Sequence, residues 1–223
     1  LHVTFRKGNV AVQAVAGISF TMGQGETLGL VGESGCGKTT TGRAVVQVER
    51  ATSGRIRFND TDITALSRGD LRTLRTQIQM IFQDPISSLN PRRRVIDIVA
   101  EPLTIWKIGS KDERREAAIA MLDRVGIDPL VNGTRRPREF SGGQCQRISI
   151  ARALVMKPKL LVCDEIVSAL DVSVQAQILN LLEDLKAEYN LTVLFIAHDL
   201  AVVKNVSDRV AVMYLGRLCE IAP

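Results

Sequence analysis

The chain has 223 residues, which suits one large domain or one domain with an inserted subdomain. Its residues are 45% hydrophobic, 24% charged and 4% aromatic, and these values exclude a disordered tail, a collagen-like repeat and a disulfide-rich miniprotein. The net charge of +5 permits an anionic partner without specifying one, because acidic residues are interspersed with the basic ones.

The apolar segments are too short to cross a membrane. The longest candidates, at 160–162 and 191–197, have the length of strands, whereas a membrane-spanning helix needs about 20 apolar residues. No basic region followed by an apolar region opens the chain, so we expect no secretory signal. The four cysteines show neither C-x-x-C spacing nor an adjacent histidine. This usage is typical of a reduced protein of the cytosol rather than of a zinc or redox site.

Short β-branched segments alternate with helical patterns along the chain, which predicts an α/β fold. The expected strands are 10–15, 18–22, 27–31, 56–58, 78–82, 160–163, 192–197 and 210–214. The strands at 160–163 and 192–197 are apolar throughout, as expected for strands covered on both faces. They therefore belong at the centre of the sheet.

The middle of the chain has a different pattern, because strand signals vanish from Asp84 to Arg138. Ser110 and Glu113 form a capping-box pattern, which predicts a helix that ends at about Val125. We therefore expect a helical subdomain inserted into the α/β core.

An amphipathic helix is expected after residues 170–173, where Asp171 or Ser173 could cap its start. Its apolar stripe consists of Val174, Ile178, Leu181, Leu182 and Leu185.

The segment GESGCGKT at 32–39 matches the pattern G-x-x-x-x-G-K-[ST] of a phosphate-binding loop. Its glycines let backbone N–H groups approach phosphates at the start of a helix, whose dipole favours anions. Lys38 would bring positive charge to the β- and γ-phosphates, and the Thr39 hydroxyl can ligate Mg²⁺. A glycine turn without a ligand is the alternative. The predicted nucleotide-binding residues are Gly32, Glu33, Ser34, Gly35, Cys36, Gly37, Lys38, Thr39 and Thr40.

Polar residues follow two of the apolar strands. Asp164 and Glu165 come at the end of LLVCDE, and His198 follows the strand at 192–197. The carboxyl ends of parallel strands lie at the edge where open α/β sheets bind ligands. We therefore expect Asp164 to belong to the Mg²⁺ shell, Glu165 to polarise the attacking water, and His198 to reach the γ-phosphate. Ordinary strand ends and a capping or packed histidine are the alternatives.

The segment FSGGQCQR at 140–147 predicts a second exposed helix start, with an amphipathic helix continuing to about Met156. Such a start suits an anion, although a plain turn capped by Ser141 fits as well. Two anion-binding helix starts about a hundred residues apart suggest that two chains face each other head to tail, each completing the other's site.

Six motifs in this order resemble the nucleotide-binding subunit of ATP-binding cassette transporters over essentially the whole chain. They are GESGCGKT at 32–39, the glutamine loop at Gln83, SGGQ at 141–144, LLVCDE at 160–165, SALD at 168–171 and His198. The resemblance implies a RecA-like P-loop NTPase core with an N-terminal antiparallel β subdomain. It assigns the core to residues 1–83 and 157–223 and an α-helical subdomain to residues 84–156.

The resemblance also implies roles that spacing alone leaves open. Phe5 is the best match to an aromatic residue that stacks on adenine, although it also fits an ordinary strand residue. Gln83 would contact ATP, Mg²⁺ and water and sense the membrane subunit, and Asp164 would hold Mg²⁺ through water. Glu165 and His198 would be catalytic. The residues expected to contact ATP across a dimer are Ser141, Gly142, Gly143, Gln144 and Asp171.

The segment DPISSLNPRRRV at 84–95 resembles the subfamily that energises uptake of dipeptides, oligopeptides, glutathione or nickel in bacteria. Three residues depart from the family pattern: Phe140 replaces leucine, Cys145 replaces a basic residue and Ile166 replaces proline. These departures leave ATP binding intact and leave open the hydrolysis rate and the packing of the helical subdomain.

The resemblance implies an ATP hydrolase with ATP and Mg²⁺ as cofactors, peripheral to the cytoplasmic face of the inner membrane. Its partners would be a second, identical or paralogous nucleotide-binding subunit, polytopic permease subunits and, indirectly, a substrate-binding protein. A soluble ATPase of the same family that acts on nucleic acid or ribosomes is the alternative. We expect no nucleic acid partner, because such proteins usually carry large insertions or two cassettes. The basic clusters at 92–94 and 135–138 then fit solvated faces or partner contacts.

Overall fold

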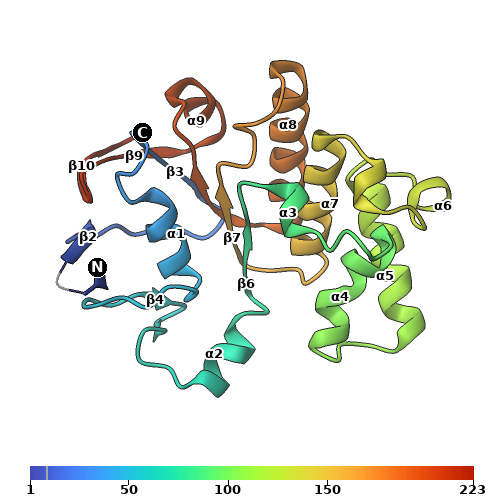
Figure 1. The fold of residues 1–223 in the computed structure, drawn as a ribbon, viewed down its shortest axis with the longest axis horizontal. Helices are drawn as coiled ribbons and strands as arrows, with labels where there is room; N and C mark the ends of the chain where they lie inside the picture. Colours follow the sequence, from blue (N-terminus) through green and yellow to red (C-terminus); the bar gives the residue numbers. More distant parts are fainter. Residues whose placement is uncertain (9) are drawn as a thin grey trace.

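The structure, a computed structural model, describes residues 1–8 and 10–223. A six-stranded sheet at its centre has the strand order β10–β9–β3–β8–β7–β6 (Figure 1). The strands are β3 (Thr27–Gly32), β6 (Ile78–Ile81), β7 (Leu160–Asp164), β8 (Thr192–Ile196), β9 (Arg209–Tyr214) and β10 (Arg217–Ala222). All neighbouring pairs are parallel except β9 and β10, which form an antiparallel hairpin.

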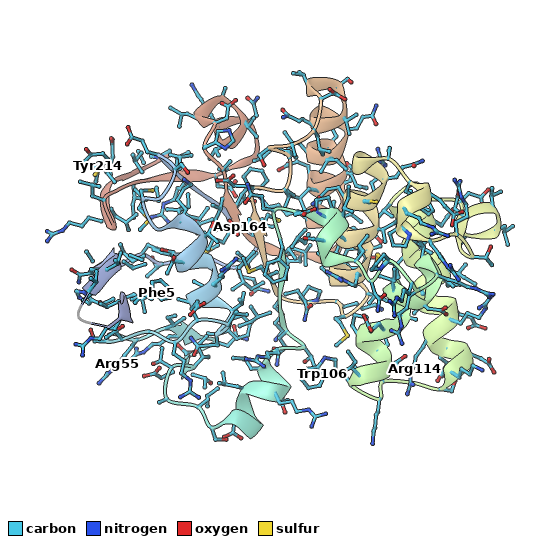
Figure 2. The ribbon with its side chains drawn as sticks, in the orientation of Figure 1. Phe5, Arg55, Trp106, Arg114, Asp164 and Tyr214 are labelled. Carbon is cyan, nitrogen blue, oxygen red and sulfur yellow. The ribbon has the colours of Figure 1, made fainter. Side chains whose placement is uncertain are left out.

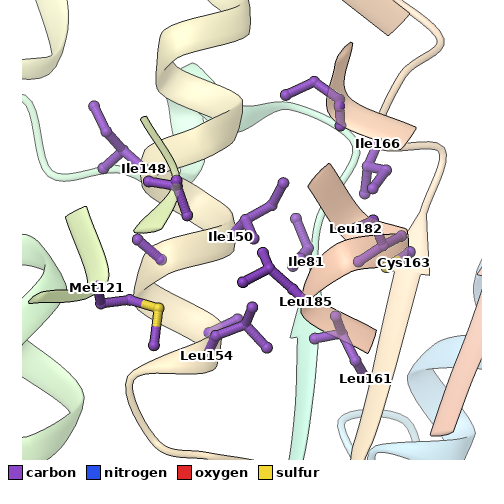
Figure 3. Packing of buried hydrophobic residues seen from close by; sticks show 14 of the residues in the cluster. Ile81, Met121, Ile148, Ile150, Leu154, Leu161, Cys163, Ile166, Leu182 and Leu185 are labelled. Carbon is purple, nitrogen blue, oxygen red and sulfur yellow. The ribbon is translucent and has the colours of Figure 1, made fainter. Parts of the chain in front are cut away.

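Of the two strands expected at the centre of the sheet, β8 lies there, and β7 lies between β8 and the edge strand β6. Alternate side chains of β7 and β8 enter two apolar cores, one on each face of the sheet. Leu161 and Phe195 belong to the core beneath the helices that follow β6 and β7, while Val162 and Ile196 belong to the core on the opposite face. Figure 3 shows part of the first core. Burial on both faces explains the continuous apolar sequence of these strands.

The helices outside the segment between β6 and β7 are α1 (Lys38–Val45), α2 (Arg68–Leu74), α8 (Val172–Tyr189) and α9 (Leu200–Val206). The stripe predicted for α8 is present, since Ile178, Leu182 and Leu185 are buried. Asp171 holds the capping position of α8, and its side chain accepts no capping hydrogen bond.

The segment between β6 and β7 is helical, as predicted, and lies beside the edge strand β6 (Figure 1). It contains α3 (Pro85–Ser88), α4 (Val95–Ile105), α5 (Lys111–Arg124), α6 (Pro129–Asn132), the 3₁₀ turn Pro137–Glu139 and α7 (Gly142–Leu154). The predicted capping box opens α5, because Ser110 accepts from the backbone N–H of Glu113 and Glu113 accepts from that of Ser110. One apolar core continues from α5 and α7 to β7, and the exact subdomain boundaries at 83/84 and 156/157 stay a prediction.

The N-terminal part contains two small antiparallel pairs, β1 (His2–Lys7) with β2 (Val10–Ala16) and β4 (Arg57–Phe58) with β5 (Thr61–Asp62). The strand expected at 18–22 is wrong. Ile18 is buried there and the side chains alternate inward and outward, yet no strand of the described residues pairs with this segment. The sequence pattern therefore reported burial against the core and not a hydrogen-bonded ladder.

Among the described residues, no helix combines the length and the apolar character that crossing a membrane requires. All four cysteines carry free thiols.

Candidate active site

The loop that joins β3 to α1 forms the phosphate-binding loop predicted from GESGCGKT. Gly37, with φ of 105°, occupies the capping position of α1, and none of the described side chains caps this helix start. A Cβ atom on Gly37 would lie 2.1 Å from the Ala14 carbonyl oxygen, so the loop passes too close to β2 for any side chain at this position. Helix α1 thus presents unsatisfied backbone N–H groups to a ligand.

Lys38 has its side chain folded under this loop. Its Nζ atom donates to the carbonyl oxygens of Gly32 at 2.8 Å and Glu33 at 2.9 Å, and the residue is only 4% exposed. Lys38 forms no ion pair with any of the described residues. A buried amino group whose hydrogen-bond partners are carbonyl oxygens, and not a carboxylate, is available to bind an anionic group such as a phosphate.

Thr39 and Asp164 provide two adjacent oxygen atoms at the carboxyl edge of the sheet. The Thr39 hydroxyl donates to Asp164 Oδ1 at 2.8 Å. Asp164 is 2% exposed, at the centre of the molecule (Figure 2). Burial raises the pKa of the Asp164 carboxyl, and the neighbouring charge of Glu165 adds to this effect, although the hydrogen bond from Thr39 opposes it.

This oxygen pair fits Mg²⁺. Hard cations prefer oxygen ligands, and Mg²⁺ in nucleotide sites is commonly held by one or two protein oxygens together with substrate phosphates. A cation would also offset the cost of keeping the Asp164 carboxylate ionised while buried.

Glu165 has a backbone conformation that is uncommon for a residue with a side chain. Its φ is +50°, in the left-handed region. Three hydrogen bonds hold this turn. The Glu165 backbone N–H donates to the Ile196 carbonyl oxygen at 2.9 Å, and the Glu165 carbonyl oxygen accepts from the Ser168 hydroxyl at 2.9 Å and from the Ser168 backbone N–H at 3.2 Å. A strained backbone persists only where the surrounding structure imposes it, and such positions cluster at functional sites.

The Glu165 carboxylate meets two other predicted residues. Its Oε2 atom accepts a hydrogen bond of 3.0 Å from the Gln83 amide and lies 3.7 Å from His198 Nδ1. The His198 side chain is 57% exposed, in contrast to that of Glu165 at 16%. The imidazole therefore faces solvent beside an enclosed carboxylate.

A cavity of about 230 Å³ lies at this site, and Asp164 and His198 do not line it. It is lined by Ala14, Ser34, Gly35, Gly37, Lys38, Thr39, Thr40, Gln83 and Glu165. A larger, mainly apolar cavity of about 440 Å³ lies against β4 and contains none of the predicted site residues. Chemistry and not size thus identifies the site. Ala14 was not predicted as a site residue, because a small residue in a strand gives no indication of what its side chain faces.

Phe5 lies on the β1–β2 hairpin, opposite Val12, and is 43% exposed (Figure 2). It does not line the 230 Å³ cavity. The Cys36 side chain is buried, so this residue would offer its backbone to a ligand and not its thiol. The contact of Phe5 with adenine stays a prediction.

The second predicted helix start, SGGQ, lies at the beginning of α7. Ser141 accepts from the Gln144 backbone N–H at 3.3 Å, and the Gln144 side chain accepts from the Ser141 N–H at 3.0 Å. A Cβ on Gly143 would lie 2.5 Å from Val174 of α8, so close packing against α8 requires glycine here. Neither this segment nor Asp171 lines the phosphate cavity. Their contact with ATP across a dimer stays a prediction.

The three residues that depart from the family pattern all pack against other residues of this chain. Cys145 and Ile166 are buried in the core that joins α7 to the sheet. The Arg135 guanidinium lies over the Phe140 ring, with its Cζ atom 4.9 Å from the ring centroid. All three positions therefore contribute to packing around the site, and none lines the cavity.

The family profile described as ABC transporter matches residues 15–168. The chain is 54% identical over 211 residues to the oligopeptide transport ATP-binding protein AppF of Bacillus subtilis, covering 94% of this chain and 64% of that protein. It is 53% identical over 212 residues to OppF of Escherichia coli, covering 94% and 63%. The glutathione import ATP-binding protein GsiA of Salmonella paratyphi A is 52% identical over 219 residues, covering 98% and 35%. The chain thus spans just under two thirds of the first two relatives.

Solved structures agree with the predicted fold class. A dimeric, post-hydrolysis ATP-binding cassette bound to ADP and Pi superimposes with a TM-score of 0.89 at 27% identity, covering 99% of this chain and 94% of the other. CbiO1 from Clostridium perfringens, part of an ABC transporter complex, gives 0.87 at 30% identity, covering 98% and 85%. The α/β fold and the family resemblance are confirmed.

Proposed function

Because this chain belongs to the ABC transporter family, we propose that it is the ATP-binding and ATP-hydrolysing motor of an importer. The proposed cargo is a peptide. The subfamily that the chain resembles takes up dipeptides, oligopeptides, glutathione or nickel. Two relatives named for oligopeptide transport and one named for glutathione import support this choice over an ATPase that acts on nucleic acid or ribosomes.

One observation carries the proposal: the strand ends that hold Asp164, Glu165 and His198 converge on the phosphate loop. Thr39 bonds Asp164, and Glu165 lies within reach of both Gln83 and His198. This convergence of segments that are far apart in the sequence supports a cation site and a general base beside one phosphate cavity.

In this mechanism the chain binds ATP through backbone N–H groups of residues 33–40 and through the ammonium of Lys38. Thr39, Gln83 and Asp164 would hold Mg²⁺, the last of them through water; the bound ion supplies positive charge to the phosphate oxygens. The Glu165 carboxylate orients a water molecule and takes its proton, while the Gln83 amide fixes the carboxylate by its bond to Oε2. The water oxygen bonds to the γ-phosphorus, the bond to the β-phosphate oxygen breaks, and His198 contacts the departing phosphate.

The other half of the site comes from a second chain. SGGQ at 141–144 and Asp171 carry the residues that the family pattern assigns to ATP, yet both lie outside the cavity. A head-to-tail dimer would bring SGGQ of one chain over the phosphate loop of the other, in keeping with the dimeric cassette that this chain resembles. The second chain is either an identical or a paralogous subunit.

The proposed assembly also includes polytopic permease subunits and, through them, a substrate-binding protein. The chain would lie peripherally on the cytoplasmic face of the cell membrane and would pass its motion to the permease through the surface around Gln83.

The test uses the full-length protein with and without the substitution Glu165→Gln, which keeps the shape of the side chain and removes the base. We expect the parent protein to hydrolyse ATP in the presence of Mg²⁺, and Glu165→Gln to bind ATP and accumulate as a dimer in size-exclusion chromatography with light scattering. Turnover by Glu165→Gln close to that of the parent would contradict the role of Glu165. Copurification with nucleic acid or ribosomes and not with permease subunits would favour the alternative.

A further inference from the structure

The turn between β9 and β10 lies directly on the phosphate loop, although the two are far apart in the sequence. Gly216 in this turn donates its N–H to the Cys36 carbonyl oxygen at 2.9 Å. Its own carbonyl accepts from the Ala16 N–H at 2.7 Å. A single residue therefore connects the phosphate loop to the end of β2, two residues from Ala14 of the phosphate cavity.

Gly216 lies close against β2. Its φ is +79°, and a Cβ atom would lie 3.1 Å from the Ala14 carbonyl oxygen, 3.3 Å from the Ala16 nitrogen and 3.4 Å from Ala16 Cβ. All three neighbours belong to β2, and the closest two are backbone atoms that no rotamer change can move. An added methyl group would therefore crowd β2, and we expect the β1–β2 hairpin to yield by about a few tenths of an ångström.

The end of β9 supports the same loop from below. Gly32 pairs with Met213 in the parallel ladder, and a Cβ on Gly32 would lie 2.1 Å from the Met213 carbonyl oxygen. The phosphate loop is thus packed against β9, and the turn that follows reaches over to β2.

We propose that Gly216 is a positioning residue that fixes the β1–β2 hairpin relative to the phosphate loop. The hairpin carries Phe5, and the loop carries the phosphate-binding groups, so Gly216 lets the base and the phosphates of one nucleotide be held at a set separation. This inference rests on the proposed ATP binding. It assigns a role in that binding to Gly216, which belongs neither to the β1–β2 hairpin nor to the phosphate loop.

The test compares Gly216→Ala with Gly126→Ala. Gly126 has a similar φ of +73°, and a Cβ there would meet only the end of the flexible Arg147 side chain at 3.0 Å. Both variants impose the same left-handed strain on alanine, but only Gly216→Ala displaces the hairpin. Calorimetric titrations with ATP and with inorganic tripolyphosphate, both with Mg²⁺, separate contacts to the whole nucleotide from contacts to the phosphates.

We expect Gly216→Ala to weaken ATP binding by about tenfold, a loss in line with small misplacements of binding groups, and to leave tripolyphosphate binding nearly unchanged. Gly126→Ala should bind both ligands like the parent protein. If Gly216→Ala does not fold, Gly216→Asn replaces it, because asparagine tolerates left-handed backbone while its Cβ crowds β2 equally. That variant should show the same selective loss of ATP binding.

Equal affinity for ATP in the parent and the Gly216 variant would overturn the inference, and so would a parallel loss of ATP and tripolyphosphate. A parent protein that binds neither ligand would instead refute the proposed function itself.

Discussion

Two helix starts in this chain contain glycines and suit an anion, but only one of them, at α7, is capped by side chains. At α1, Gly37 leaves the first N–H groups without a side-chain cap, and Lys38, Thr39 and Asp164 gather around them. At α7, Ser141 and Gln144 cap each other, and no charged side chain of residues 1–8 and 10–223 is hydrogen-bonded to this start. The helix start alone does not make a site. The first start is completed by its own chain, and the second needs another molecule.

The largest effect tests the start of α1. We expect Lys38→Ala to lower ATP turnover by at least about a hundredfold, since it removes the charge that stabilises developing negative charge on the phosphates. Turnover of the purified protein with Mg-ATP gives the measurement, and circular dichroism checks the fold. The control is Lys204→Ala, an exposed lysine of α9. Full activity of Lys38→Ala would mean that α1 is no better a site than α7.

The next prediction tests the start of α7 against a matched helix. Ser141→Ala and Ser110→Ala each break a capping box of the helical part, so each should lower the free energy of unfolding by about 1 kcal/mol. Only Ser141→Ala should also lower turnover, by about tenfold or more, because only Ser141 is proposed to contact ATP of a second chain. Urea unfolding and ATPase assays measure the two effects. A similar turnover in both variants would leave Ser141 with a structural role alone.

Mixing variants sharpens this comparison. In a head-to-tail dimer of one Lys38→Ala chain and one Ser141→Ala chain, one of the two sites combines both defects, while the other has an intact phosphate loop and an intact SGGQ segment. We therefore expect the mixture to regain part of the activity that each variant lacks alone, provided that the chains exchange and that one intact site turns over. No regain in mixtures shown by light scattering to contain dimers would argue against head-to-tail sharing.

A smaller effect concerns the cost of the groups around α1. Burial raises the pKa of Asp164, so the ionised carboxylate destabilises the fold at neutral pH, and this penalty disappears as the pH falls toward the ordinary aspartate value of about 3.9. Asp164→Asn should raise the urea midpoint of the ligand-free protein at pH 7, by an amount that shrinks as the pH falls toward the ordinary aspartate value of about 3.9. It should also weaken the Mg²⁺ dependence of nucleotide binding. A lower urea midpoint at pH 7 would show that the carboxylate is a net stabiliser.

The smallest effect lies at the far end of the strand that leads to α1. Asp208 accepts from the Thr27 N–H at 2.7 Å and from Lys186 at 3.0 Å, and these bonds, led by the backbone one, lower its pKa. A lowered pKa means that the stabilisation is present above about pH 4 and is lost as the pH falls through the lowered value. Asp208→Asn should cost less than about 1 kcal/mol at pH 7, because the side chain is half exposed, and should leave turnover unchanged. Urea unfolding at pH 7 and pH 3 measures the difference.

Local sequence determined those parts of the protein that depend on neighbouring residues. The phosphate loop between β3 and α1, the capping boxes of α5 and α7 and the buried strands β7 and β8 each follow from a short pattern of residue types. The same patterns predicted the family and the α/β fold, because a strand before the glycine loop and a helix after it are the context that makes a phosphate-loop motif specific.

Tertiary structure decided what depends on strand order and partners. Placing β8 between β3 and β7 brings His198 and Glu165 together, and no pattern along the chain encodes that order. The edge strands β1 and β10 were not predicted, and the strand predicted at 18–22 was wrong. Both errors have one cause: a strand is defined by the backbone that pairs with it and not by its own apolar content. The left-handed backbone of Glu165 and the bridge through Gly216 arise in the same way. Both require contacts between segments that only the folded chain brings within hydrogen-bond distance.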